Sequence, residues 1–429
     1  MVLQKYSTIL QKAKSDSEAF LSCRLRLYPL VIRQFEKNSQ SCYIVKNVIS
    51  KRTKMQYNEF NGEKLSTLGL GLMRLPCVDG KYENIDEAKT AEMIDFSLES
   101  GINYFDAAWM YHHGNSEKVA GKLLMRHRRE SFLLADKFPG QLAEAVQDPE
   151  KTFNTQMERC GCGFFDFYLL HNVNEANLDY YLDDKKYGIV SYLLKQKAAG
   201  KFRHFGFSCH CTLATLEKFL DRYADIMEFG QLQLNYLDWH LQNAAAKVEL
   251  LKKYDLPIWV MEPLRGGKLA EYTPETAGEF AADRSAVETG FNFLQAIPEV
   301  KMVLSGMSNM AQLKENIRIF SDPRPLNKAE FDKLTALSAG MIAKLGVPCT
   351  KCSYCVSKCP QKLNIPQLLE LYNEFKVAEG AWIPKMVIGE LPENERPAAC
   401  VNCRSCEKIC PQGIEISRIF GEFTEALKK

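Results

Sequence analysis

Two copies of one cysteine motif constrain this chain more than any other feature of its sequence. The first copy holds Cys349, Cys352, Cys355 and Cys359, and the second holds Cys400, Cys403, Cys406 and Cys410. Both read C-x2-C-x2-C-x3-C-P, and every cysteine repeats at an offset of 51 residues. Because this spacing places three thiolates around one cubane, the motif predicts two [4Fe–4S] clusters.

The fourth cysteine of each copy usually binds the other cluster in such pairs. We therefore assign Cys349, Cys352, Cys355 and Cys410 to one cluster, and Cys400, Cys403, Cys406 and Cys359 to the other. Zinc is the alternative, but zinc sites prefer two C-x2-C pairs. Helical patterns at 368–375 and 416–423 predict a small, mainly helical ferredoxin-like domain over 326–429, which opens with a linker helix near 328–345.

Composition narrows the class of protein. The chain has 429 residues, long enough for a large domain and an accessory module, and its net charge of +2 gives no reason to expect nucleic acid or an anionic membrane. No apolar run reaches the roughly 18 residues of a membrane span. Eight of the 15 cysteines fall in the doubled motif, which indicates metal in a reducing, cytoplasmic compartment.

Residues 1–54 differ from the rest of the chain. They hold 11 Lys and Arg against 3 Asp and Glu, without the compact apolar segment of a secretory signal. We expect a basic, poorly ordered extension, with an organelle transit peptide as the alternative.

The pattern changes at Met55. Asn61-Gly62 joins two short strand-like runs and predicts a β-hairpin with a type I′ turn. Eight further apolar runs alternate with amphipathic stretches. These runs are 68–72, 104–107, 132–135, 165–170, 202–207, 230–234, 257–261 and 302–304. The alternation predicts an α/β fold, a (β/α)8 TIM barrel over 55–325 with an N-terminal hairpin. No G-x-G-x-x-G follows an early strand, which disfavours a doubly wound open sheet.

Active sites of such barrels lie at the C-terminal ends of the strands. Four titratable residues follow consecutive predicted strands there: Asp106, Tyr111, Lys137 and His171. The segments Gly101–Tyr111, Ala135–Lys137 and Phe167–His171 resemble the aldo/keto reductase family, and the resemblance extends over 55–322.

The resemblance implies carbonyl reduction by hydride transfer. Tyr111 would protonate the carbonyl oxygen, and we expect Lys137 to lower the pKa of Tyr111 from about 10. Asp106 would anchor Lys137, and His171 would hold the substrate oxygen or share the proton.

A nicotinamide cofactor, NADP(H) or NAD(H), follows from the same resemblance. Loops after strands 7 and 8 commonly bind phosphate, and here they hold Leu264, Arg265, Gly266, Gly267 and Lys268, then Gly306 and Ser308. By resemblance Ser208 and Gln233 contact the nicotinamide amide, whereas Gln312, Glu315 and Asn316 lie beside the adenosine. Cys209, Met261 and Gln312 depart from the family's common Asn, aromatic residue and Arg, which leaves the choice of nicotinamide open.

Three interpretations stay open. In the first, the enzyme reduces a small-molecule carbonyl and its clusters exchange electrons with a redox partner protein. In the second, an ordinary carbonyl reductase has structural or redox-sensing clusters. In the third, the chain is a non-enzymatic electron-transfer module. A hydride carries two electrons whereas each cluster carries one at a time, and the sequence shows no flavin motif.

Overall fold

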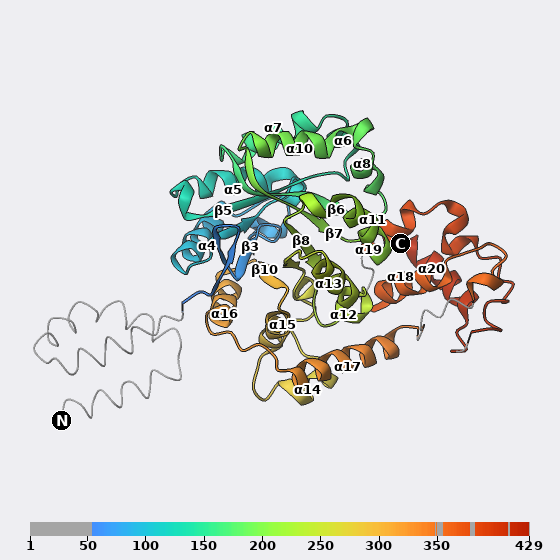
Figure 1. Ribbon diagram of the computed structural model, residues 1–429. Helices are drawn as coiled ribbons and strands as arrows, with labels where there is room; N and C mark the ends of the chain where they lie inside the picture. The colour runs from blue at the N-terminus through green and yellow to red at the C-terminus, as the bar shows by residue number, and fades with distance from the viewer. Residues whose placement is uncertain (1–53, 348, 350–354, 378–381, 411, 429) are drawn as a thin grey trace, which may run out of the picture. The chain divides into compact units, whose positions relative to one another are not determined.

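Figure 1 shows the computed structural model, which describes residues 54–347, 349, 355–377, 382–410 and 412–428. Except for Lys54, the extension predicted over 1–54 lies outside the described residues. Across the described ranges, no helix combines the length and apolar character that a membrane crossing requires.

Eight parallel strands close into a barrel, in the order β10-β3-β4-β5-β6-β7-β8-β9. The strands are β3 (Leu68–Gly71), β4 (Tyr104–Asp106), β5 (Leu133–Phe138), β6 (Phe165–Val173), β7 (Phe202–Cys209), β8 (Phe229–Gln233), β9 (Ile258–Met261) and β10 (Val300–Gly306). All eight predicted strands are confirmed, with ends that differ by a few residues.

A helix follows each barrel strand and covers its outer face (Figure 1). These helices are α4 (Glu87–Glu99), α5 (Asn115–Leu124), α7 (Pro149–Cys160), α10 (Ile189–Ala198), α11 (Leu213–Tyr223), α13 (Ala244–Lys253), α15 (Ala286–Gln295) and α16 (Met310–Ser321). Shorter helices lie in the loops: α6 (Ala143–Gln147), α8 (Leu178–Leu182), α9 (Asp184–Tyr187), α12 (Asp238–Leu241) and α14 (Pro274–Phe280). The (β/α)8 prediction is therefore confirmed.

The predicted hairpin is present as β1 (Tyr57–Phe60) and β2 (Glu63–Ser66). Asn61 and Gly62 both have positive φ, 47° and 87°, as a type I′ turn requires. Phe60 and Leu65 of the hairpin pack with side chains that fill the barrel interior, among them Phe167 and Trp259. The hairpin thus closes one end of the barrel and leaves the other end for the site.

The C-terminal domain is built from helices around a separate core. The linker helix α17 (Lys328–Leu345) begins at a capping box between Asn327 and Glu330. The remaining helices are α18 (Ile365–Val377), α19 (Trp382–Glu390) and α20 (Ile416–Leu427). Their apolar faces, including Leu368 and Phe420, bury against one another together with Cys355 and Cys406. The described part of this domain confirms the mainly helical ferredoxin-like prediction.

Candidate active site and cluster sites

The four predicted catalytic residues converge at the C-terminal end of the barrel. Asp106 ends β4, Lys137 lies in β5, His171 lies in β6, and Tyr111 begins the 3-10 turn η2 (Tyr111–Gly114) that follows β4. Lys137 Nζ donates to Asp106 Oδ2 at 2.5 Å and to the Ala107 carbonyl oxygen at 2.7 Å. It also lies 3.4 Å from the Tyr111 hydroxyl. The Tyr111 and His171 rings meet edge to face at 6.2 Å.

Burial sets the charge states of this group. Burial raises the pKa of Tyr111 to about 12, although Lys137 acts in the opposite direction. Lys137 does lower the pKa of Tyr111, as predicted. Burial raises it by more, however, so the pKa does not fall below 10 as expected. Burial lowers the pKa of Lys137, but Asp106 and Tyr111 reverse this and raise it. At neutral pH the site consequently holds a neutral phenol beside a cationic amine.

His171 is neutral for related reasons. Burial, with the charge of Lys137 and the neighbouring His210, lowers the pKa of His171 well below its usual value. Its Nδ1 lies 3.3 Å from the Gln141 side-chain nitrogen. Because an amide nitrogen donates, Nδ1 accepts in this arrangement and Nε2 keeps the ring proton.

Strained backbone fixes the position of Tyr111. His112 and His113, which follow it directly, both have positive φ, 52° and 54°. His112 is fully buried, accepts from the Leu75 N–H at 3.2 Å, and stacks on Tyr82. Such a conformation persists only where the surroundings over-determine it. The sequence reasoning missed this support, for which the His-His pair was the only signal.

Exposed apolar side chains surround the site. The loops after β3 and β4 expose Met73, Val78, Tyr82 and Met110. Trp382, which begins α19 of the C-terminal domain, is 52% exposed and packs edge to face on His210 at 5.2 Å. His210 is near enough to His171 to affect its pKa, so the C-terminal domain reaches the neighbourhood of the site.

The two residues predicted for a nicotinamide amide lie at the ends of β7 and β8, beside Asn172 of β6. Ser208 is buried, and its Oγ accepts from the Asn172 N–H at 2.8 Å. Asn172 has a positive φ of 54°, and its side-chain oxygen has no partner in the described structure. Gln233 Nε2 donates to Asp238 at 2.8 Å. A carboxamide fits here because it donates and accepts; the sequence reasoning missed Asn172.

The two predicted phosphate loops meet at Arg74. A side chain on Gly266, or on Gly306 at the end of β10, would come within 3.0 Å of the Arg74 side chain. Ser308 Oγ donates to the Arg74 carbonyl oxygen at 2.9 Å. Arg74 is half exposed and lies 3.7 Å from Glu262. A cation over two glycine-containing loops suits a phosphate, and the sequence reasoning missed it.

Arg265 was predicted to bind a phosphate of the cofactor, but the structure places it in ion pairs within the protein. Its guanidinium is 7% exposed and pairs with Asp238 and, at 3.7 Å, with Glu374. It therefore does not point to a ligand, because its charge is already neutralised within the protein. Lys268 is exposed on the same loop, and Leu264 and Met261 are partly buried.

The three residues predicted beside the adenosine lie on α16. Asn316 is buried, and its side chain donates to Ser305 at 3.0 Å. Gln312 is exposed and accepts from the Ser308 N–H at 2.8 Å, and Glu315 is partly buried. The structure therefore brings Gln312 to the loop that holds Gly306 and Ser308.

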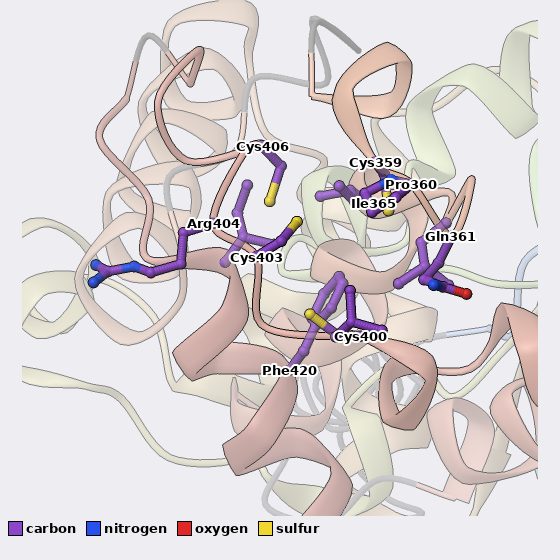
Figure 2. Close-up of a pocket in the computed structure, with 12 residues that line it drawn as sticks. Cys359, Pro360, Gln361, Ile365, Cys400, Cys403, Arg404, Cys406 and Phe420 are labelled. Carbon is purple, nitrogen blue, oxygen red and sulfur yellow. The ribbon is translucent and has the colours of Figure 1, made fainter.

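Four cysteines line one hollow in the C-terminal domain, as Figure 2 shows. Cys400, Cys403 and Cys406 come from the second motif, and Cys359 comes from the first. Burial raises the pKa of Cys406 to about 11, and the nearby Cys400 and Cys359 add to this shift. The four thiols are the set predicted for one cluster, and they fit that group because they surround an apolar hollow.

The other predicted set is partly described. Cys355 is buried, Cys349 and Cys410 are partly buried, and Cys352 lies outside the described residues. Within the described ranges, no three His, Cys, Asp or Glu side chains come close enough to hold a single metal ion. Ligands of a four-iron cubane stand farther apart than those of one ion.

Comparisons with known proteins agree with this arrangement. A family model described as "Aldo/keto reductase family" matches residues 67–339, and one described as "4Fe-4S dicluster domain" matches residues 348–415. The uncharacterized oxidoreductase YqkF of Bacillus subtilis is 24% identical over 306 residues, covering 63% of this chain and 92% of that protein. L-galactose dehydrogenase of Arabidopsis thaliana is 24% identical over 284 residues, covering 60% and 84%.

Solved structures share the barrel. The holo form of aldo-keto reductase AKR11C1 from Bacillus halodurans aligns with a TM-score of 0.55 at 22% identity, covering 66% of this chain and 96% of that one. The thermostable aldo-keto reductase Tm1743 aligns with a TM-score of 0.54 at 22% identity, covering 66% and 100%. These likenesses concern the fold. The family match spans more than half of the chain, which therefore belongs to the aldo/keto reductase family as an NAD(P)H-dependent oxidoreductase with an added iron–sulfur domain.

Proposed function

We propose that this chain reduces a small carbonyl compound by hydride transfer from NADPH or NADH, and that its iron–sulfur clusters exchange electrons with a redox partner protein. The observation that carries the enzymatic part is the contact of Lys137 with both Asp106 and Tyr111. A neutral phenol next to a cation is a proton donor whose conjugate base is stabilised in advance.

The proton movement follows from this contact. Tyr111 gives its phenolic proton to the carbonyl oxygen, and the phenolate that remains faces Lys137 Nζ. Asp106 keeps Lys137 charged and in place, because its carboxylate accepts from Nζ and raises the pKa of the buried amine. Neutral His171 donates from Nε2 to the same carbonyl oxygen. The exposed apolar side chains of Met73 and Met110 favour a substrate with an apolar body.

A bound nicotinamide supplies the hydride. Ser208, Asn172 and Gln233 would hold its carboxamide, with the unpartnered Asn172 oxygen accepting from the amide nitrogen. Arg74 would bind phosphate between the loops that hold Gly266 and Gly306. Gln312 and Asn316 would lie beside the adenosine. NADP(H) and NAD(H) are distinguished by the experiment below.

A bound [4Fe–4S] cluster supplies one-electron transfer. Cys359, Cys400, Cys403 and Cys406 would hold a cluster near the surface, because Cys403 is exposed and Val401 in the same loop is 56% exposed. This exposure supports contact with a redox partner. The contacts between Glu374 and the barrel favour a second candidate, in which the clusters maintain the domain and pass no electrons.

Isotope transfer tests the hydride step. The anaerobically purified protein is given a panel of aldehydes, ketones and quinones with NADPH or NADH deuterated at the nicotinamide C4. We expect deuterium on the carbinol carbon of an aldehyde or ketone product. Product labelled only when the solvent is deuterated would contradict hydride transfer.

One-electron chemistry separates the two roles of the clusters. NADPH-dependent reduction of ferricyanide is measured in the wild type and in Cys403→Ser. If the clusters exchange electrons, Cys403→Ser loses ferricyanide reduction and keeps carbonyl reduction. A wild type that reduces carbonyls but not ferricyanide supports the structural role.

A further inference from the structure

A buried group of charges joins the C-terminal domain to the barrel. Arg265 in the 3-10 turn η5 (Arg265–Gly267) pairs with Asp238 of α12 and lies 3.7 Å from Glu374 of α18. Asp238 is 0% exposed and Glu374 is 4% exposed, so water screens the interactions between these charges only weakly. Two carboxylates, one from each domain, thus surround one guanidinium.

Arg265 also holds a strained backbone. Its φ of 47° lies in the left-handed region, which an arginine rarely adopts, and Gly266 and Gly267 continue the turn with positive φ. A strained residue stays in place only where the surroundings over-determine it. Here the buried ion pairs of the Arg265 side chain supply that constraint, so the conformation of the loop depends on Asp238 and Glu374.

Asp238 extends the group to the predicted nicotinamide end of the cofactor site. Its Oδ2 accepts from Gln233 Nε2 at 2.8 Å and from Asn235 Nδ2 at 2.6 Å. Asn235 Nδ2 also donates to the Glu262 carbonyl oxygen at 3.0 Å, just after β9. One carboxylate therefore orients Gln233 and, through Arg265, the loop expected at the phosphates.

Further contacts hold Glu374 and its helix in place from both domains. Its Oε1 accepts from Gln242 Nε2 at 2.6 Å. The preceding Asn373 accepts from the Val347 N–H at 2.6 Å and donates to the Val347 carbonyl oxygen at 2.8 Å, two residues before Cys349. The helix α18 thus connects the first cysteine motif with Arg265.

We propose that Glu374 is a positioning residue of the cofactor site, through which the iron–sulfur domain completes the binding site for the nicotinamide dinucleotide. This inference rests on the proposed cofactor site. Ionised Glu374 holds Arg265, which keeps the 264–268 loop and Asp238 in their binding arrangement. Cofactor affinity then depends on Glu374, which acts through Arg265 and Asp238 rather than by a contact of its own with the cofactor.

The charges around Glu374 give this proposal a pH signature. Burial and Asp238 raise the pKa of Glu374 to about 7, while Arg265, Gln242 and Lys247 of α13 oppose them. The carboxyl group is therefore mostly protonated at pH 6 and mostly ionised at pH 8. Because the ionised form holds Arg265 more strongly, cofactor affinity should rise between these two values.

Calorimetric titration of the full holoprotein with NADP⁺ and NAD⁺ tests the proposal at pH 6 and pH 8. The variants are Glu374→Gln, the charge-retaining Glu374→Asp and the control Glu390→Gln, which changes an exposed glutamate of the same domain. At pH 8 we expect Glu374→Gln to raise the dissociation constant about 5-fold or more, the lower range of typical coupling between sites. Glu374→Asp recovers part of the affinity, and Glu390→Gln behaves as wild type.

A structural effect alone would not give the accompanying results. Glu374→Gln should lose the pH dependence of affinity, keep its iron content, and show wild-type kcat at saturating nucleotide with a raised KM for it. Unchanged affinity in Glu374→Gln overturns the inference and leaves the proposed function intact, whereas a wild type that transfers no hydride overturns the proposed function. If Glu374→Gln does not retain its iron, the test rests on the wild-type protein alone. A wild-type cofactor affinity that is the same at pH 6 and pH 8 then overturns the inference.

Discussion

Cys359 of the first cysteine motif lies in the same hollow as Cys406 of the second, close enough to raise the pKa of Cys406. Cys400 and Cys403 complete the lining (Figure 2). The two motifs are therefore interleaved in space, as expected when the last cysteine of one copy serves the other cluster.

Crossed ligation predicts where a defect appears. Cys359→Ser should impair the cluster held by the second motif, and its reduced-state EPR spectrum should match that of Cys403→Ser. Cys410→Ser is the matched control and should resemble Cys349→Ser. A Cys359→Ser spectrum that matches Cys349→Ser would instead show that each motif binds its own cluster.

Metal content follows from the two complete motifs. The anaerobically purified chain should contain about eight iron atoms and eight acid-labile sulfides, because two [4Fe–4S] clusters need that number. Elemental analysis with a sulfide assay measures both. About four iron atoms per chain, or zinc in their place, is incompatible with the assignment.

The variant Lys137→Met tests whether the lysine cation assists Tyr111 as the proton donor. Without the cation, the pKa of Tyr111 rises still higher and the phenolate loses its counter-charge. Carbonyl reduction should fall by roughly 10²–10⁴, the usual worth of general acid catalysis. Steady-state kinetics measures this, with iron content as the control because no predicted cluster ligand lies in the barrel. A rate within the error of wild type would remove Lys137 from the mechanism.

The raised pKa of Glu374 predicts how stability depends on pH. A carboxyl whose folded-state pKa is about 7, above its unfolded value near 4.3, binds its proton more tightly in the folded state. Its contribution to stability is complete below about pH 4.3 and is lost as pH rises through 7. Thermal unfolding should therefore shift downward between pH 6 and pH 8 in wild type and less in Glu374→Gln. Equal shifts in both proteins would argue against the assigned titration.

The sequence predicted what local patterns encode. Eight alternating apolar runs defined the barrel, and the linker helix was predicted over the observed Lys328–Leu345. The cysteine spacing likewise grouped Cys359 with the second motif, and these four cysteines line one hollow. These features follow a regular spacing along the chain, so residues that are close in sequence are enough to predict them.

Long-range burial was not readable in the same way. The sequence predicted that the cation of Lys137 lowers the pKa of Tyr111. Burial of the site raises this pKa by more than Lys137 lowers it, and the extent of burial is not visible in the sequence. Arg265 looked like a phosphate ligand because it precedes two glycines, but its partner Glu374 belongs to another domain. Arg74 and Asn172 had no motif, since tertiary folding alone brings them to the site.

The proposed carbonyl reduction depends on the phenolic proton of Tyr111. Tyr111→Phe keeps the ring and deletes the donor, and Tyr254→Phe, which removes a hydroxyl that contacts Asp221 outside the site, is the matched control. The direct test is kcat for carbonyl reduction at saturating nucleotide, beside calorimetric titration of the cofactor. We expect Tyr111→Phe to lose roughly 10²–10⁴ in kcat with nearly unchanged nucleotide affinity, and Tyr254→Phe to match wild type. A Tyr111→Phe enzyme that reduces the same carbonyl as fast as wild type would show that Tyr111 is not the proton donor.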